Sequence, residues 1–182
     1  PPPYLHNKGQ IRELASSGST VTPSVLRKLY KQGTNSGHSS HSQSIFSTSD
    51  EYFSQSDLLQ FQNKHGLKAQ EAVSVGEHSL SLSSPAMCST PSASTGYDCF
   101  EGNLDIQYIM GVAQDTKTIY HYVGDSNPFI SYITAVSGDS DPPKVMSISW
   151  GSTEQAVSSA VMSAFCSEAL ALAARGVSIL VS

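Results

Sequence analysis

The sequence contains few basic residues, few cysteines and no long apolar run, and each shortage excludes a class of protein. The 10 Lys and Arg residues against 15 Asp and Glu leave a net charge of −5, without the basic stripe typical of nucleic-acid binders. No run approaches the ~18 apolar residues that span a bilayer, and the start shows neither region of a signal peptide. We therefore expect a soluble chain, any signal peptide having been removed, with no nucleic-acid or membrane partner.

The three cysteines form no CxxC motif and no Cys/His cluster, so no metal site is expected in this chain. Cys88 and Cys99 flank a loop rich in Ser, Thr and Pro, and could form a disulfide in an oxidising compartment. Cys166 could bond another chain or be a buried thiol, and the second is the commoner fate of a lone helical cysteine. His38 and His41 are interpreted as exposed loop histidines.

Helix and strand signals alternate along most of the chain. Helices are predicted from Thr22 and Pro23, from Ser54 or Ser56 to Gly66, and over 101–113, 128–136 and 155–175, with Gly176 as a C-terminal stop. Strands are predicted over 73–75, 118–123, 144–149 and 177–181, and loops over 31–44 and 79–97.

This alternation predicts an α/β fold with a mostly parallel sheet, crossover helices and functional residues at the carboxyl ends of the strands. The strands over 144–149 and 177–181 are expected to be neighbours at its centre. Residues 1–20 are rich in Pro, Gly and Ser, which indicates an extended arm or the end of a processed leader. Residues 21–182 then form the folded part.

Glu101 and Asp105 lie four residues apart in a predicted helix, so both carboxylates project from one face. On a solvated surface the two carboxylates would only interact favourably with the helix macrodipole at the start of the helix. In a closed site they would raise one another's pKa and could share a proton, which makes a base that works in acid. Spacing alone favours the first interpretation.

The segment around this pair resembles a helix of the sedolisin family of serine-carboxyl peptidases. Its sequence over 100–110 is Phe-Glu-Gly-Asn-Leu-Asp-Ile-Gln-Tyr-Ile-Met. Segments 21–30, 52–58 and 145–151 resemble further family segments in the same order. The resemblance covers roughly residues 20–182 and implies the N-terminal half of a subtilisin-like, three-layer domain with a mostly parallel sheet.

By this resemblance, Glu101 is the general base that takes the proton of a nucleophilic serine, and Asp105 holds and tunes Glu101. Ser149, Trp150 and Gly151 match the strand whose backbone pairs with an extended peptide substrate. A glutamate base in place of histidine implies activity in acid, through an acyl-enzyme.

Two departures from the family pattern are evident. The Gly-Thr-Ser motif of the nucleophile does not occur in the sequence, and the Gly-Asp-Ser motif of the oxyanion aspartate is expected just after Ser182. The similar letters at 138–140 are interpreted as a turn. A C-terminal chain of the same peptidase is therefore the expected partner, carrying the serine, the oxyanion aspartate and the family's Ca²⁺ site. Asp50 and Glu51 are left unassigned.

Endopeptidase action on peptides or proteins is the expected function, with tripeptidyl-peptidase action as an alternative within the family. A catalytically inactive binding or regulatory fragment is the alternative from another class. Acid chemistry and disulfide use together indicate a lysosome-like acidic vesicle or secretion.

Overall fold

The computed structural model describes residues 20–33, 37–76, 79–80 and 99–182. Within these ranges the elements in chain order are α2 Pro23–Leu29, β1 Ser42–Ser47, β2 Phe53–Ser54, α3 Gln55–Lys64, β3 Val73–Val75, β4 Ser79–Leu80, α4 Phe100–Val112, β5 Lys117–Tyr122, α5 Pro128–Ser137, β6 Val145–Ile148, the 3₁₀-helix η2 Glu154–Ala156, α6 Ser159–Ala174 and β7 Ser178–Val181.

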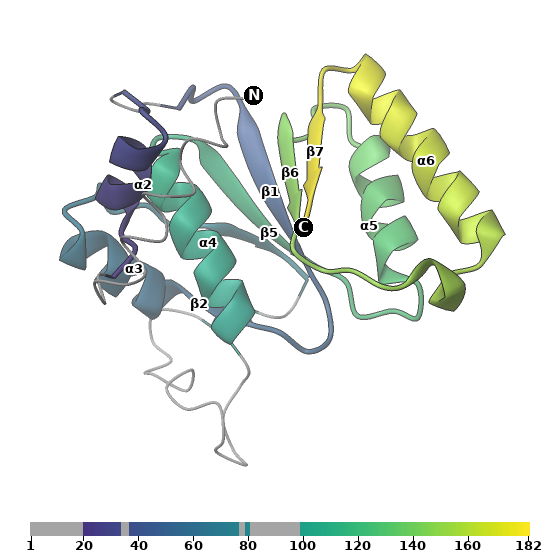
Figure 1. Cartoon of the computed structure of the whole chain (residues 1–182), viewed down its shortest axis with the longest axis horizontal. Helices are drawn as coiled ribbons and strands as arrows, with labels where there is room; N and C mark the ends of the chain where they lie inside the picture. The colour runs from purple at the N-terminus through teal and green to yellow at the C-terminus, as the bar shows by residue number, and fades with distance from the viewer. Residues whose placement is uncertain (1–19, 34–36, 77–78, 81–98) are drawn as a thin grey trace, which may run out of the picture.

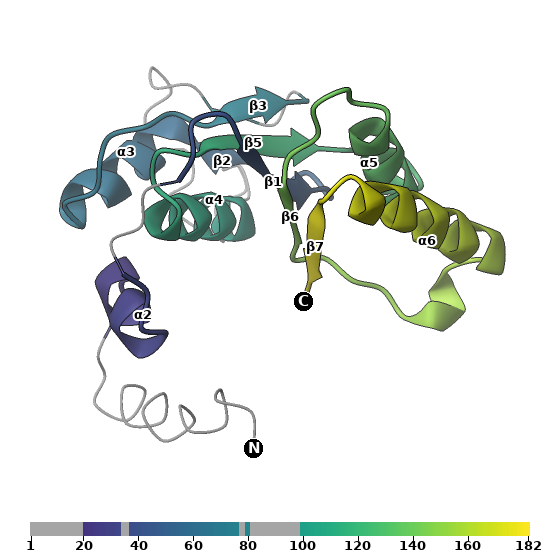
Figure 2. The same cartoon turned by 90° about the horizontal axis from the view of Figure 1, so that it is seen from above.

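A sheet of parallel strands in the order β3-β5-β1-β6-β7 forms the middle layer. Helices α3 and α4 lie on one face, with α2 packed against α4, and α5 and α6 cover the other (Figure 1, Figure 2). A smaller parallel pair joins β2 to β4. The expected three-layer α/β fold with a parallel sheet is confirmed.

Strand β1 lies between β5 and β6, and its alternating side chains enter two separate cores. Ile45 packs with Ile106 and Tyr120 on the α4 side of the sheet. Phe46 packs with Tyr132 on the α5 and α6 side, with the two ring centroids 5.0 Å apart. The strand therefore ties both layers of helices to the sheet.

The predicted loop over 31–44 was wrong at its end, because β1 begins there. Gln43, Ser44 and Ser47 of β1 are residue types typical of a loop, yet hydrogen bonds satisfy their side chains in the core. Ser44 Oγ lies 2.7 Å from the hydroxyl of Tyr132, and the side-chain amide of Gln43 donates to Thr118 Oγ1 at 2.9 Å. Because buried polar groups are tolerated when they are paired, a polar segment can occupy the centre of the sheet.

Strands β6 and β7 are parallel neighbours as predicted, with Val145 beside Ser178 and Ile148 beside Val181. The prediction that both are central was wrong for β7, which lies at the edge of the described sheet because β1 takes the centre. Leu180 and Val181 of β7 are 56% and 62% exposed.

Helix ends largely follow the signals in the sequence. Thr22 Oγ1 accepts from the Val25 amide at 3.3 Å at the start of α2, and Ser54 Oγ accepts from Asp57 at 3.2 Å at the start of α3. Gly176 follows α6 with a φ of 77°, a conformation that favours glycine.

The long helix predicted over 155–175 is divided. The backbone is extended after η2, at 157–158, and the Ser158 side chain then caps α6. The loop predicted over 79–97 begins with β4, and its residues 81–97 lie outside the described ranges, as do residues 1–19 of the predicted arm. Among the helices described, none combines the length and the apolar character that crossing a membrane requires.

Candidate active site

An open cleft of about 340 Å³ lies at the carboxyl end of the sheet. Its walls come from the segment after β1, the start of α4 and the segment after β6, through Glu51, Phe100, Glu101, Ser149 and Trp150. Parallel strands deliver the residues that follow them to one edge, and the first turn of α4 lies at that edge (Figure 1). Three residues predicted for the site thus line one cleft.

The predicted acidic pair lies on one face of α4, with both side chains half-buried. Ser149 Oγ donates to Asp105 Oδ1 at 3.2 Å, which joins the helix to the end of β6. Burial, and then the charge of Glu101, raise the pKa of Asp105 to about 6, against the lowering effect of the Ser149 hydrogen bond. Asp105 therefore keeps its proton in mild acid, where an ordinary aspartate would be ionised.

Glu51 is a third carboxyl group of the site, and sequence reasoning left it unassigned. It is 4% exposed, and its Oε1 accepts a hydrogen bond of 2.8 Å from the backbone amide of Gly102. Its charge also contributes to the raised pKa of Asp105. Because β1 was not predicted, no signal placed the segment after it beside α4.

Gly102 allows this contact, since a side chain there has no room. A Cβ atom would lie 2.1 Å from the Tyr52 carbonyl oxygen and 2.8 Å from the Tyr120 hydroxyl. The close approach positions the first turn of α4 directly against the segment that carries Glu51. The glycine between the two acidic residues is thus a packing requirement.

Further hydrogen bonds hold the start of α4 in place. Asn103 Oδ1 accepts from the amide of Ser54 at 2.9 Å, and its Nδ2 donates to Asp57 at 2.9 Å. The buried Tyr120 hydroxyl donates to the Glu51 carbonyl at 3.0 Å, and burial raises the pKa of this tyrosine. Glu101 therefore projects from a turn that is fixed on two sides, as a preorganised base requires.

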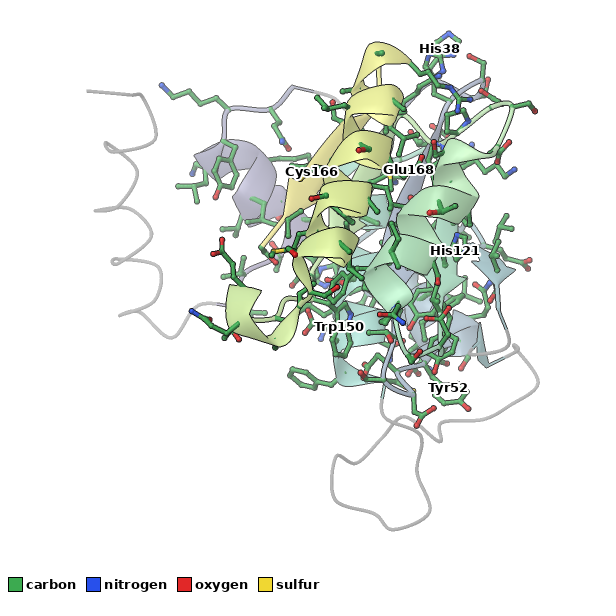
Figure 3. The ribbon with its side chains drawn as sticks, turned by 90° about the vertical axis from the view of Figure 1, so that its right-hand side faces the viewer. His38, Tyr52, His121, Trp150, Cys166 and Glu168 are labelled. Carbon is green, nitrogen blue, oxygen red and sulfur yellow. The ribbon has the colours of Figure 1, made fainter. Side chains whose placement is uncertain are left out.

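The predicted substrate segment lies opposite Glu101 across the cleft. Ser149 and Trp150 line it, and Gly151 is exposed just beyond. Trp150 is half-buried against the core on the α5 and α6 side of the sheet. Figure 3 shows Trp150 and Tyr52 at one end of the molecule and His38 at the other, so the predicted loop histidines lie far from the cleft.

The two cysteines that the structure describes differ in redox state. Cys99, directly before α4, is disulfide-bonded, whereas Cys88 lies outside the described residues, so the pairing of the two stays a prediction. Cys166 is a free, exposed thiol on α6. The expectation that it is buried was wrong, because the face of α6 that carries it points away from the sheet.

The remaining motifs do not join the site. Arg175 donates to the carbonyl oxygens of Ser137 and Ser140, so the segment at 138–140 forms part of a structural turn, as predicted. The part of the chain that the structure describes has no group of three His, Cys, Asp or Glu side chains that could hold a metal ion.

The chain is similar in sequence to two named peptidases. It is 30% identical over 182 residues to tripeptidyl-peptidase 1 of Pongo abelii, which covers 96% of this chain and 30% of that protein. It is 31% identical over 167 residues to tripeptidyl-peptidase 1 of Homo sapiens, which covers 88% of this chain and 28% of that protein. The chain thus spans less than a third of the length of these relatives. No protein-family model matches it.

A solved structure shares the fold. Pseudomonas sedolisin, a serine-carboxyl proteinase, superposes with a TM-score of 0.61 at 18% identity, over 88% of this chain and 43% of that one. At this identity the likeness shows the fold, which is the subtilisin-like arrangement expected from the sequence.

Proposed function

Since the chain belongs to the sedolisin family of serine-carboxyl peptidases, we propose that it provides the base and the peptide-binding segment of an acid-acting peptidase. One observation carries this proposal: Glu101 and the segment at 149–150 share a cleft, and Asp105 hydrogen-bonds to Ser149 beside it. The positions of both carboxylates also match the family motif.

In this mechanism a serine hydroxyl from outside the chain attacks the peptide carbonyl, and Glu101 accepts its proton. Glu101 then passes the proton to the leaving amine as the C–N bond breaks, which leaves an acyl-enzyme. Water attacks the ester, and Glu101 again accepts and returns a proton. Asp105, which keeps its own proton below about pH 6, adds little negative charge beside Glu101 in acid.

The substrate is expected to lie as an extended strand along 149–151, paired through the backbone. Exposed Gly151 has nothing within 4 Å of an added Cβ, so a peptide backbone could approach it closely.

A second polypeptide with the serine and the oxyanion aspartate belongs to the proposal. Two surfaces support it. Strand β7 presents an unpaired edge in the described sheet, with Leu180 and Val181 more than half exposed, and Leu170 on α6 is 72% exposed. Edges and apolar patches of this kind are normally covered in stable proteins.

Two substrate modes compete, and they differ in what they require of the substrate's amino terminus. Endopeptidase action is our first proposal. The names of the curated relatives favour tripeptidyl release. Peptides with a free and with an acetylated amino terminus separate the modes, since tripeptidyl release requires the free amine and an endopeptidase cleaves both.

The cellular compartment and the bound metal ion are also part of the proposal. An acid-acting, disulfide-bonded chain suits a lysosome-like vesicle or secretion. Calcium is expected on the C-terminal half, and no step above depends on it.

The proposal is tested by digestion of an unfolded protein from acidic to neutral pH, comparing the native preparation with Glu101→Gln. The amide keeps the size of the side chain but cannot accept the proton, so activity in acid should fall by about 10²- to 10⁴-fold. Glu154→Gln, at an exposed position outside the cleft, is the matched control.

Intact mass with and without reductant identifies any second polypeptide in the same preparation. Activity in acid that is retained in Glu101→Gln would exclude this base. No activity at any pH, with a single polypeptide by mass, would favour the inactive binding fragment.

A further inference from the structure

Ser149 belongs to two parts of the site at once. It directly follows β6 in the proposed substrate segment, and it lines the same cleft as Glu101. Its hydroxyl donates to Asp105 Oδ1 at 3.2 Å, in a contact between residues 44 positions apart in the chain. The hydrogen bond therefore joins the segment that would hold a peptide to the helix that carries the base.

The described groups that face Asp105 act on its proton in opposite directions. Burial, the charge of Glu101 on the same helix and the charge of Glu51 on the segment after β1 all favour the protonated form. The Tyr120 hydroxyl of β5 interacts with the same carboxyl group, but burial raises the pKa of this tyrosine, so it stays neutral in acid. Of the groups named here, only the Ser149 hydroxyl favours the ionised form, because a donor stabilises a carboxylate.

The number of protons on the acid pair decides how much charge lies beside the reacting carbonyl group. With one proton on Asp105, Glu101 can be ionised and accept the serine proton, and the pair carries a single charge. When this last proton is lost, two negative charges lie beside the oxyanion that forms on the substrate, and their repulsion raises the barrier. The upper pH limit of activity should therefore follow the second titration step of the pair.

We propose that Ser149 is a positioning residue for the acid pair: its hydroxyl holds the Asp105 carboxyl group beside the substrate segment and sets the pH above which activity is lost. The inference rests on the proposed function, because it takes Glu101 as the base. It gives a role to the side chain of a residue that was expected to act through its backbone. A peptide bound along 149–151 would pair with the same residue that controls the charge of the acid pair.

The test compares pH profiles of kcat/KM, which report the free enzyme, for an internally quenched peptide that the native preparation cleaves. Ser149→Ala removes the donor that favours the carboxylate, so the neutral limb of the profile should move to higher pH by about 0.5–1 unit. Ser149→Thr keeps a hydroxyl group on Cβ and should restore the native limb. Ser147→Ala, two residues earlier in β6 and outside the lining of the cleft, is the matched control and should not move it.

A second measurement does not depend on activity. Native stability should fall as pH rises from 3.8 through about 6, because Asp105 ionises later in the native state than in the unfolded chain. In Ser149→Ala this fall should extend to higher pH by the same 0.5–1 unit, about the effect of one hydrogen bond. Asp105→Asn should abolish the difference between serine and alanine at 149, since the two residues act through one contact.

The outcomes separate the two proposals. A neutral limb that stays in place in Ser149→Ala, or activity that falls equally at every pH, would overturn the role of this hydroxyl group. A preparation that cleaves no peptide at any pH would instead overturn the proposed function, and melting curves across pH would still test the hydrogen bond.

Discussion

Replacing Gly102 by alanine tests how closely the start of α4 is packed against the carboxylate cleft. The new Cβ would lie 2.1 Å from a backbone oxygen of Tyr52, whereas ordinary contact begins at 3.4 Å. Because the obstacle is backbone, it cannot rotate away, and the first turn of α4 must shift. The shift also breaks the hydrogen bond from the Gly102 amide to Glu51.

The size of the effect follows from opposing contributions. Alanine should stabilise the helix by about 1 kcal/mol over glycine. Overpacking costs about 1–3 kcal/mol, and leaving the buried Glu51 carboxylate without this partner costs about 1–3 kcal/mol more. We therefore expect the free energy of unfolding to fall by about 1–5 kcal/mol, with a midpoint near ~3 kcal/mol. A displaced Glu101 should lower kcat by about a hundredfold.

Urea unfolding of the purified protein, with any chain that accompanies it, measures this loss as a lower transition midpoint at an unchanged slope. Gly111→Ala is the matched control in the same helix, because its Cβ meets only side-chain atoms, at 3.0 Å from Pro23 and 3.3 Å from Phe61. If Gly102→Ala and Gly111→Ala have equal stability and equal kcat, the packing described for the cleft is incorrect.

Three further predictions concern the same end of the molecule. Asp105→Asn should raise the free energy of unfolding at pH 7 by about 1 kcal/mol after solvent screening, and should not do so at pH 3.5. The reason is that a raised pKa destabilises the native state only as pH rises from 3.8 through about 6. Melting curves across pH measure this, with Asp141→Asn at an exposed position as the matched control. Glu51→Ala should lower the free energy of unfolding by about 1–3 kcal/mol, whereas Glu51→Gln retains an acceptor for the Gly102 amide and should cost less; equal losses in urea unfolding would contradict this role. Ser54→Ala should cost about 1 kcal/mol by removing the cap of α3, as a lower thermal midpoint, and an unchanged midpoint would show that the cap contributes nothing.

Much of the fold follows from local signals in the sequence. Apolar patterns predict α4, α5, β5 and β6 because the apolar side chains of these elements are the ones that they bury. The apolar run at 177–181 also predicts β7 as a strand, although its side chains are mostly exposed in the described sheet. Strand β1 could not be predicted in this way, since its buried polar residues are satisfied by Thr118 and Tyr132, far along the chain.

The residues of the candidate site also differ in whether local sequence signals could predict them. Glu101 and Asp105 could be predicted because one helix carries both, and because the sequence around them resembles that of one family. Glu51 could not be assigned, since its place depends on the path of the chain after β1 and on the space left by Gly102.

The polar centre of the sheet also affects the order of events during synthesis. The partners of Gln43 and Ser44 lie 75 and 88 residues later in the chain. At a translation rate of 5–20 residues per second, a ribosome needs roughly 4–18 s to make that stretch. Until β5 has been made, β1 has neither of its neighbouring strands, and its polar side chains favour contact with water during this time. A more apolar central strand would be exposed to aggregation for the same time.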